Sequence, residues 1–181
     1  MHWFSDRQSQ WRSWIDVFGW SSAAAERLGD VRLQAVHRNY LSWALTMHQQ
    51  YEEAARMAER AGALARSAGD VRQEAWAHRY AADARGWDRP HRKGDIAALS
   101  HHRRASELFD QIGNVEGWLT SAAGHGRELG RFGRFVEGLE LLDRVLARIE
   151  EQTTGESIPA NLALAENNAA VAAQVAVALA G

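Results

Sequence analysis

The sequence contains no cysteine and only two prolines, Pro90 and Pro159, in 181 residues. The absence of cysteine excludes a disulfide framework and thiolate metal sites, and it fits a cytoplasmic location. Scarce proline leaves long stretches in which a helix can continue without interruption. The chain also lacks an uncharged apolar run of the roughly 18 residues that a membrane-spanning helix requires. These absences predict a protein without disulfides and without contact with a membrane.

Neither sign of charge is in large excess, because the chain has 21 basic and 23 acidic residues and a net charge of −2. Proteins dedicated to nucleic acid present a strongly basic face, so this balance argues against direct nucleic-acid binding. Apolar residues make up 46% of the chain, which is enough for a sizeable core. Alanine, leucine, arginine and glutamate recur and β-branched runs are scarce, so the composition predicts an all-α fold.

A three-residue motif of glycine, Asp or Asn, and valine recurs as Gly29-Asp30-Val31, Gly69-Asp70-Val71 and Gly113-Asn114-Val115. Glycine adopts the left-handed conformation that ends many helices, and Asp or Asn can cap the next helix. The three glycines lie 40 and 44 residues apart, and a recurring unit of this size indicates an array of helical hairpins. We predict about eight helices, over residues 9–28, 31–47, 51–67, 71–85, 95–112, 115–129, 134–151 and 159–179.

Small residues recur where paired helices would approach closely. They form two matching sets, Ser42, Ala82 and Gly126 in the first helices and Ala54, Ala98 and Gly138 in the second. Stacked hairpins bury one continuous core, so we expect a single domain over residues 1–181. It comprises a partial first repeat (1–30), three full repeats (31–70, 71–114 and 115–154) and a C-terminal capping or unpaired helix (155–181).

Two short motifs carry a resemblance to a known family. One reads Gly133-Arg134-Phe135 followed by Glu137-Gly138-Leu139, and the other reads Tyr51-Glu52-Glu53-Ala54-Ala55. At these residues the chain resembles the tetratricopeptide repeat (TPR) family, and its longer unit is similar to the TPR arrays of actinobacterial STAND-type transcriptional regulators, which carry an NB-ARC ATPase. No P-loop pattern occurs in this chain. The resemblance implies a right-handed α-α solenoid of antiparallel hairpins that serves as a cytoplasmic scaffold, the sensor or interaction part of a transcriptional regulator.

In the resembling family, the first helix of each hairpin lines a concave groove that binds a protein or peptide. The register places eight residues there: Asn39, Trp43, Met47, Trp76, Arg79, Asp83, Arg127 and Arg131. Aromatic side chains supply contact area and arginine can hold carboxylates, so such a groove suits an acidic, partly apolar peptide. We assign Tyr40 and Tyr80 to the core between hairpins. For Trp43, Arg79 and Arg127, packing between helices is the alternative.

No set of residues in the sequence predicts a reaction. His101 and His102 are adjacent, so on a helix their side chains point about 100 degrees apart. Other histidines, such as His78 and His125, are far apart in the sequence. No H-E-x-x-H or G-x-S-x-G pattern occurs. We therefore expect no enzyme, no catalytic residue, no metal and no cofactor. The alternative is a small-ligand receptor or an enzyme that uses the concave cavity.

Both ends of the predicted array are unpaired half-units. The last helix is rich in alanine and valine, which favours a cap that packs inward. The alternative is self-association through the terminal helices or contact with a further domain. Near the start of the chain, the tryptophans gather at Trp3, Trp11, Trp14 and Trp20. We interpret them as an aromatic end cap, with docking of another domain as the alternative.

Overall fold

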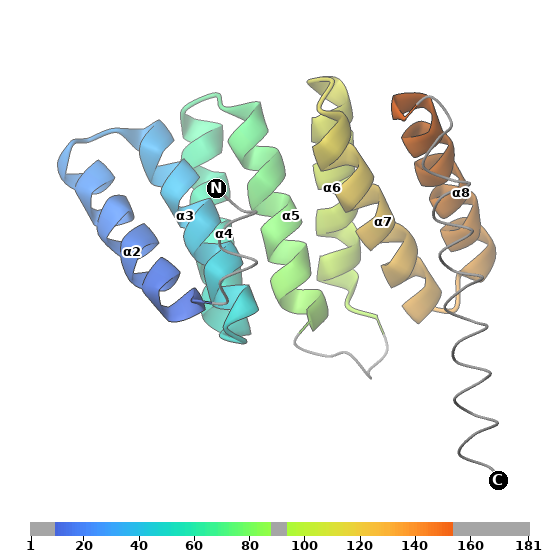
Figure 1. Ribbon diagram of the computed structural model, residues 1–181, viewed down its shortest axis with the longest axis horizontal. Helices are drawn as coiled ribbons and strands as arrows, with labels where there is room; N and C mark the ends of the chain where they lie inside the picture. The colour runs from blue at the N-terminus through green and yellow to red at the C-terminus, as the bar shows by residue number, and fades with distance from the viewer. Residues whose placement is uncertain (1–9, 88–93, 154–181) are drawn as a thin grey trace, which may run out of the picture. The chain divides into compact units, whose positions relative to one another are not determined.

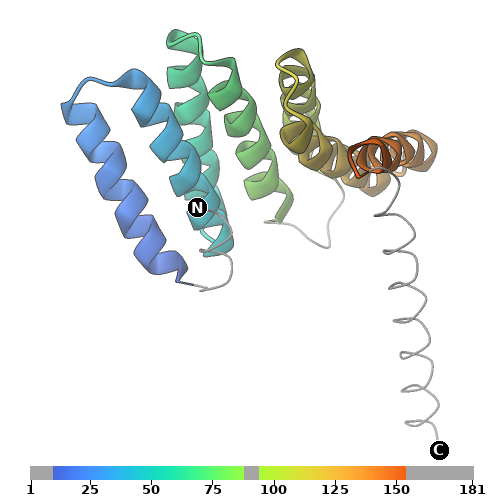
Figure 2. The ribbon, with the colours of Figure 1, turned by 45° about the horizontal axis from the view of Figure 1, so that its top comes forward.

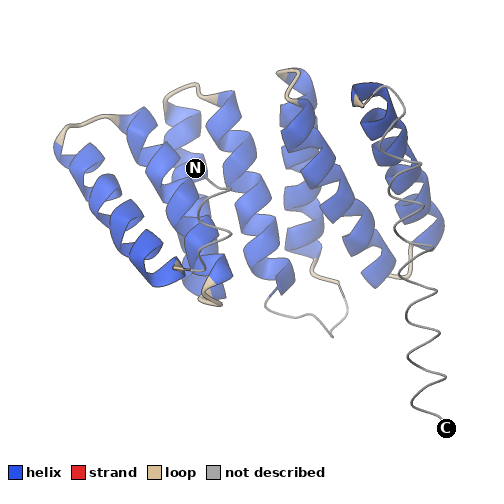
Figure 3. Cartoon of the chain, in the orientation of Figure 1, coloured by secondary structure: helices blue, strands red, loops and turns tan. Residues whose placement is uncertain are grey.

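The computed structural model describes residues 10–87 and 94–153, and every regular element within those ranges is an α-helix (Figure 3). Seven helices follow one another in the described residues (Figure 1): α2 (Trp11–Arg27), α3 (Val31–Met47), α4 (Tyr51–Ser67), α5 (Val71–Trp87), α6 (Ile96–Gln111), α7 (Val115–Arg131) and α8 (Phe135–Gln152). The all-α prediction is confirmed, but these ranges hold seven helices where eight were expected. The eighth, expected at residues 159–179, lies outside them. None of the seven is long and apolar enough to cross a membrane.

The helix bounds agree closely with the sequence prediction. Helices α3 and α4 begin and end at the predicted residues. The bounds of the other five differ from the prediction by one or two residues, which is the ordinary uncertainty at a helix end,.

The chain divides into two compact units, Met1–Leu141 and Leu142–Gly181, and the boundary falls within α8. In the first unit, each helix from α2 to α7 packs against the next helix along the chain, as both Figure 1 and Figure 2 show. Helix α5 contacts α3 and α7 in addition to its neighbours α4 and α6. Helix α5 therefore contacts four of the other helices of this unit.

The glycines of the recurring three-residue motif lie at the ends of their helices, as predicted. Their φ angles are 67°, 65° and 66° at Gly29, Gly69 and Gly113, in the left-handed region that glycine occupies without side-chain strain. At the first junction, the N–H groups of Gly29 and Asp30 donate to the carbonyls of Glu26 and Ala25 at 3.0 and 3.1 Å. The Asp30 carboxylate then accepts the N–H of Leu33 at 2.9 Å. Each junction thus satisfies backbone groups that a helix end leaves unpaired.

The small residues of the register lie at close contacts. The hydroxyl of Ser42 on α3 donates to the carbonyl of Ala54 on α4 at 2.8 Å, and both residues are fully buried. A Cβ atom added to Gly138 at the start of α8 would lie 3.0 Å from the carbonyl oxygen of Gly126 on α7. Larger side chains at these positions would push the helices apart.

Aromatic rings fill much of the space between helices. Trp11 of α2 meets Trp43 of α3 edge-on at 5.2 Å, and Phe18 stacks on Tyr40 at 5.3 Å. Tyr80 is buried, in agreement with the prediction that it belongs to the core. Of the predicted end cap, Trp11 and Trp14 pack on other rings, whereas Trp20 is 71% exposed. Trp3 lies outside the described residues.

Candidate functional site

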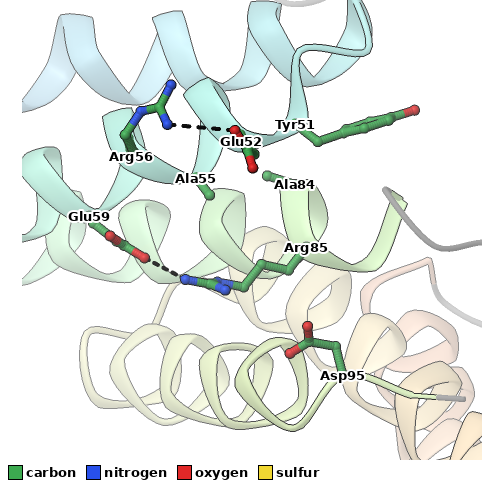
Figure 4. A pocket seen from close by; sticks show the side chains of 8 residues that line it. All are labelled: Tyr51, Glu52, Ala55, Arg56, Glu59, Ala84, Arg85 and Asp95. Atoms are coloured by element: carbon green, nitrogen blue, oxygen red, sulfur yellow. Dashed lines mark hydrogen bonds and ion pairs between the residues drawn. The ribbon is translucent and has the colours of Figure 1, made fainter.

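A charged cleft lies where α4, α5 and the start of α6 meet (Figure 4), and it encloses about 300 Å³. Its lining residues are Tyr51, Glu52, Ala55, Arg56 and Glu59 of α4, Ala84 and Arg85 of α5, and Asp95 at the start of α6. Across the cleft, Arg85 Nη2 lies 2.6 Å from Glu59 Oε1. The Asp95 carboxylate caps α6 by accepting the N–H groups of Ala97 and Ala98. Carboxylates and guanidinium groups thus alternate along the wall of this cleft.

A second hollow of about 150 Å³ lies beside the charged cleft and shares Glu59 with it. We call it the histidine cavity. Its lining residues are Ala58, Glu59, Gly62 and Arg66 of α4, Ala77, His78 and Ala81 of α5, and His101 of α6. Small residues leave this space open, because four of the eight are alanine or glycine. The charged cleft and the histidine cavity therefore form one polar region along the same three helices.

Two histidines meet at the wall of the histidine cavity. The Nδ1 atoms of His78 and His101 lie 2.8 Å apart, within hydrogen-bonding distance. One ring must donate an N–H and the other must accept it, because a neutral imidazole has one donor and one acceptor. Burial is the main cause that lowers the pKa of His78 to about 4, and the charge of His101 contributes to this shift. Burial also lowers the pKa of His101. Both rings are therefore neutral near pH 7.

Charged groups surround this histidine pair. Glu74 Oε1 lies 3.9 Å from His78 Nε2 and 3.7 Å from Arg66 Nη1. The side chains of Arg85, Glu59 and Asp95 act on His101 through their charges, which links the pair to the charged cleft. A neutral imidazole beside carboxylates and arginines can transfer a proton to or from a bound molecule. In the described part of the chain, no three or more His, Asp or Glu residues are arranged to hold a metal ion.

Sequence reasoning missed this pair. His78 and His101 are 23 residues apart and belong to different helices, and no spacing rule for a single helix connects them. The alanines that line the cavity were a usable signal, because Ala58, Ala77 and Ala81 leave room for two rings. His102, the neighbour of His101, is fully buried against α7 instead, so the two adjacent rings do lie on different faces of α6.

None of the eight residues that the sequence predicts for a groove lines the charged cleft or the histidine cavity. Asn39 is buried and donates to the carbonyl and the side chain of Gln73 at 3.0 Å. Trp43 packs on Trp11, and Trp76 packs on both Tyr80 and Phe109. Met47 is half-buried near the end of α3. Trp43 and Trp76 thus contact neighbouring helices, as the packing alternative for Trp43 proposed.

The other four predicted residues come together between α5 and α7. Arg79 forms an ion pair with Asp83 on α5. Arg131 of α7 donates to Glu128 Oε1 at 2.6 Å and to the carbonyl of Gly86 at 3.0 Å. Arg127 lies on the same helix, with its Nε atom 3.9 Å from Glu128 Oε1. Whether these residues bind a partner remains a prediction.

A comparison with known protein families matches residues 133–178 to the family described as "Indigoidine synthase A like protein". The match spans about a quarter of the chain, so it is a similarity of this segment. The comparison with curated proteins gives no match.

This match corrects the identification made from short motifs. The matched family is not a tetratricopeptide repeat family, although the match begins at Gly133, within the motif that carried the resemblance. The assignment to a TPR scaffold in transcription regulation is therefore wrong, and the expectation that the protein is not an enzyme is contradicted by the same match. Three-residue motifs such as Gly133-Arg134-Phe135 are too short to identify a family. The family description names a synthase, so the alternative of an enzyme or small-ligand receptor agrees better with this match.

Proposed function

We propose that the charged cleft and the histidine cavity form the site of an enzyme, or of a related small-ligand receptor, that acts on a small polar molecule by proton transfer. The observation that carries this proposal is the 2.8 Å contact between the Nδ1 atoms of His78 and His101 at a cavity wall. The similarity of residues 133–178 to a family named for a synthase supports the enzyme class. His78 and His101 lie outside that segment. The similarity therefore does not indicate which substrate these histidines would act on.

The surroundings of the pair favour one arrangement of its protons. Glu74 lies beside His78 Nε2, which favours the tautomer that carries its proton on that atom. His78 Nδ1 then accepts the Nδ1–H of His101, and the Nε2 lone pair of His101 is left to take a proton from a substrate. Arg66 and Arg85, which line the two hollows, can hold a negatively charged group of that substrate.

Ligand-observed NMR with a panel of small organic acids, amines and phosphates tests this proposal. We expect at least one compound to bind, and protein-observed spectra of the mixture with that compound should show shifts in the ring resonances of His78 and His101. Binding should be abolished by His101→Gln and unchanged by His48→Gln, because His48 contacts Gln50 at the end of α3, outside both hollows. A panel without any binder, or binding that survives His101→Gln, would contradict the proposal.

We also propose that the helices pair as antiparallel hairpins in a right-handed stack. The order of contacts between α4 and α5 supports antiparallel pairing. Glu59 and Arg66 of α4 meet Arg85 and Glu74 of α5, so the partners move backwards on α5 as the chain advances on α4. An experimental structure in which α4 and α5 run in the same direction, or in which the stack is left-handed, would overturn this arrangement.

A cytoplasmic location is part of the same proposal. The absence of cysteine supports it, because oxidising compartments favour proteins with disulfides,. Fractionation of cells that express the full chain would test it, and recovery outside the cytoplasm would contradict it.

A further inference from the structure

A second polar cluster lies on the side of α5 that faces α7, away from the lining of both hollows. It contains Arg79 and Asp83 of α5 and Arg127, Glu128 and Arg131 of α7, and we call it the arginine site. Helices α5 and α7 are in contact, so side chains from both can reach one bound molecule.

The charges of the arginine site do not balance. The Asp83 carboxylate pairs with Arg79, and Glu128 Oε1 accepts from Arg131 at 2.6 Å. Arg127 shares its carboxylate with Arg131, since its Nε atom lies 3.9 Å from the same Glu128 Oε1 that accepts from Arg131. The five side chains therefore carry three positive charges and two negative charges.

Arg127 and Arg79 are close enough to oppose each other's charge. Burial lowers the pKa of Arg79, and Arg127 lowers it further. The Nε atom of Arg79 is buried and has no hydrogen-bond partner in the described residues. Both side chains still reach the solvent, because 20% of the Arg79 side chain and 45% of the Arg127 side chain are exposed. An oxyanion at this position would screen the repulsion and accept hydrogen bonds from both guanidinium groups.

The imidazole of His102 is affected by the charges of the arginine site. Its side chain is fully buried, with a relative exposure of 0%. Neither ring nitrogen has a hydrogen-bond partner in the described residues. Burial lowers the pKa of His102 to about 2, and Arg79 and Arg127 contribute to this shift. The ring is therefore neutral and adds no charge to the site. It lies against Gly124 of α7, where an added Cβ atom would be 2.3 Å from the ring.

We propose that the arginine site binds a small free oxyanion, a carboxylate or a phosphate, between the guanidinium groups of Arg127 and Arg79. The ligand supplies the negative charge that the cluster lacks. A single anion can receive two donors from Arg127 and a further donor from Arg79, because a guanidinium group offers several N–H groups in a planar fork.

Isothermal titration of the full chain at low ionic strength, with inorganic phosphate and separately with acetate, tests this site. We expect saturable binding of at least one probe, and the stronger binder identifies whether phosphate or carboxylate is preferred. Arg127→Gln should weaken binding about tenfold or more, because a hydrogen bond to a charged group of this kind contributes about that factor. Arg103→Gln removes an exposed arginine of α6 that pairs with Glu107, and it should leave binding unchanged.

Two further measurements make the result specific. Circular dichroism should show that Arg127→Gln keeps the helical content of the wild-type protein. Binding that Arg127→Gln weakens and His101→Gln leaves in place belongs to the arginine site, whereas binding that only His101→Gln removes belongs to the proposed proton-transfer site, so failure of one site is distinguished from failure of the other. The absence of saturable binding with both probes, or equal binding by wild type and Arg127→Gln, would overturn the proposal.

Discussion

The Nδ1 atoms of His78 on α5 and His101 on α6 lie 2.8 Å apart. Burial lowers the pKa of His78 from 6.5 to about 4. Between these two values the folded protein binds fewer protons than the unfolded chain, because the unfolded His78 is protonated first. The free energy of unfolding therefore falls as His78 of the unfolded chain takes up its proton. The stability that depends on neutral His78 is fully present above pH 6.5 and is lost as the pH falls towards 4,.

We expect His78 to account for a loss on the order of 2 kcal/mol in the free energy of unfolding between about pH 7 and pH 5. Urea unfolding at both pH values measures it. His78→Gln should lose less stability on acidification than the wild-type protein, whereas the control His48→Gln should behave as the wild-type protein does. An identical loss in wild type and His78→Gln would show that His78 is not held neutral in the fold.

Gly124→Ala should destabilise the protein, because its methyl group would lie 2.3 Å from the His102 ring. Overpacking of this kind costs about 1–3 kcal/mol. The matched control is Gly130→Ala on the same helix, where nothing lies within 4 Å of an added Cβ. Alanine at that position should stabilise α7 by roughly 0.5–1 kcal/mol. Thermal unfolding separates the two variants, and equal melting temperatures would contradict the close packing of His102 on α7.

Ala54→Trp should lower the melting temperature. Ala54 is fully buried, and its carbonyl accepts a hydrogen bond from Ser42 across the contact between α3 and α4. A tryptophan there would separate the two helices, and a loss of about 2 kcal/mol corresponds to about 5 °C in a chain of this size. Ala63→Trp, at an exposed position on the same helix, should change the melting temperature little. Unchanged melting of Ala54→Trp would count against the contact.

Glu128→Gln should destabilise the protein far more than Glu137→Gln. Glu128 is fully buried and accepts from Arg131 at 2.6 Å, so its loss leaves a half-buried guanidinium group without its carboxylate. We expect a loss of about 1–3 kcal/mol in the free energy of unfolding. Glu137 pairs with Arg134 at the exposed start of α8, where an ion pair contributes little. Comparable effects of the two substitutions in urea unfolding would contradict the structural role of Glu128.

Local features of the sequence predicted the helices, whereas contacts between helices were harder to foresee. Gly29-Asp30 and Gly69-Asp70 form hydrogen bonds only with residues a few positions away in the sequence. Such a motif can therefore specify a helix end without help from the rest of the fold. The close approach at Ser42 and Ala54 could also be predicted, because small residues recur at both positions in each unit of the sequence.

The candidate site could not be predicted in the same way. Helical spacing assigns Trp43 and Trp76 each to one face of its own helix, but it does not say whether a neighbouring helix covers that face. In the structure a ring from another helix packs on each of them. The pair of His78 and His101 depends on how α5 packs on α6, which no local rule contains. The register selected Arg79, Arg127 and Arg131 as groove residues, which stays a prediction, and it did not foresee their ion pairs with Asp83 and Glu128.

The junctions at Gly29, Gly69 and Gly113 have a consequence for how such a chain can change over time. At the first of them, every hydrogen bond that closes the turn joins residues within five positions of each other. A turn of this kind needs nothing from distant parts of the protein. Duplication or deletion of a two-helix segment between such turns would leave each remaining turn intact, so gene-level rearrangement could lengthen or shorten this chain without the invention of a new connection.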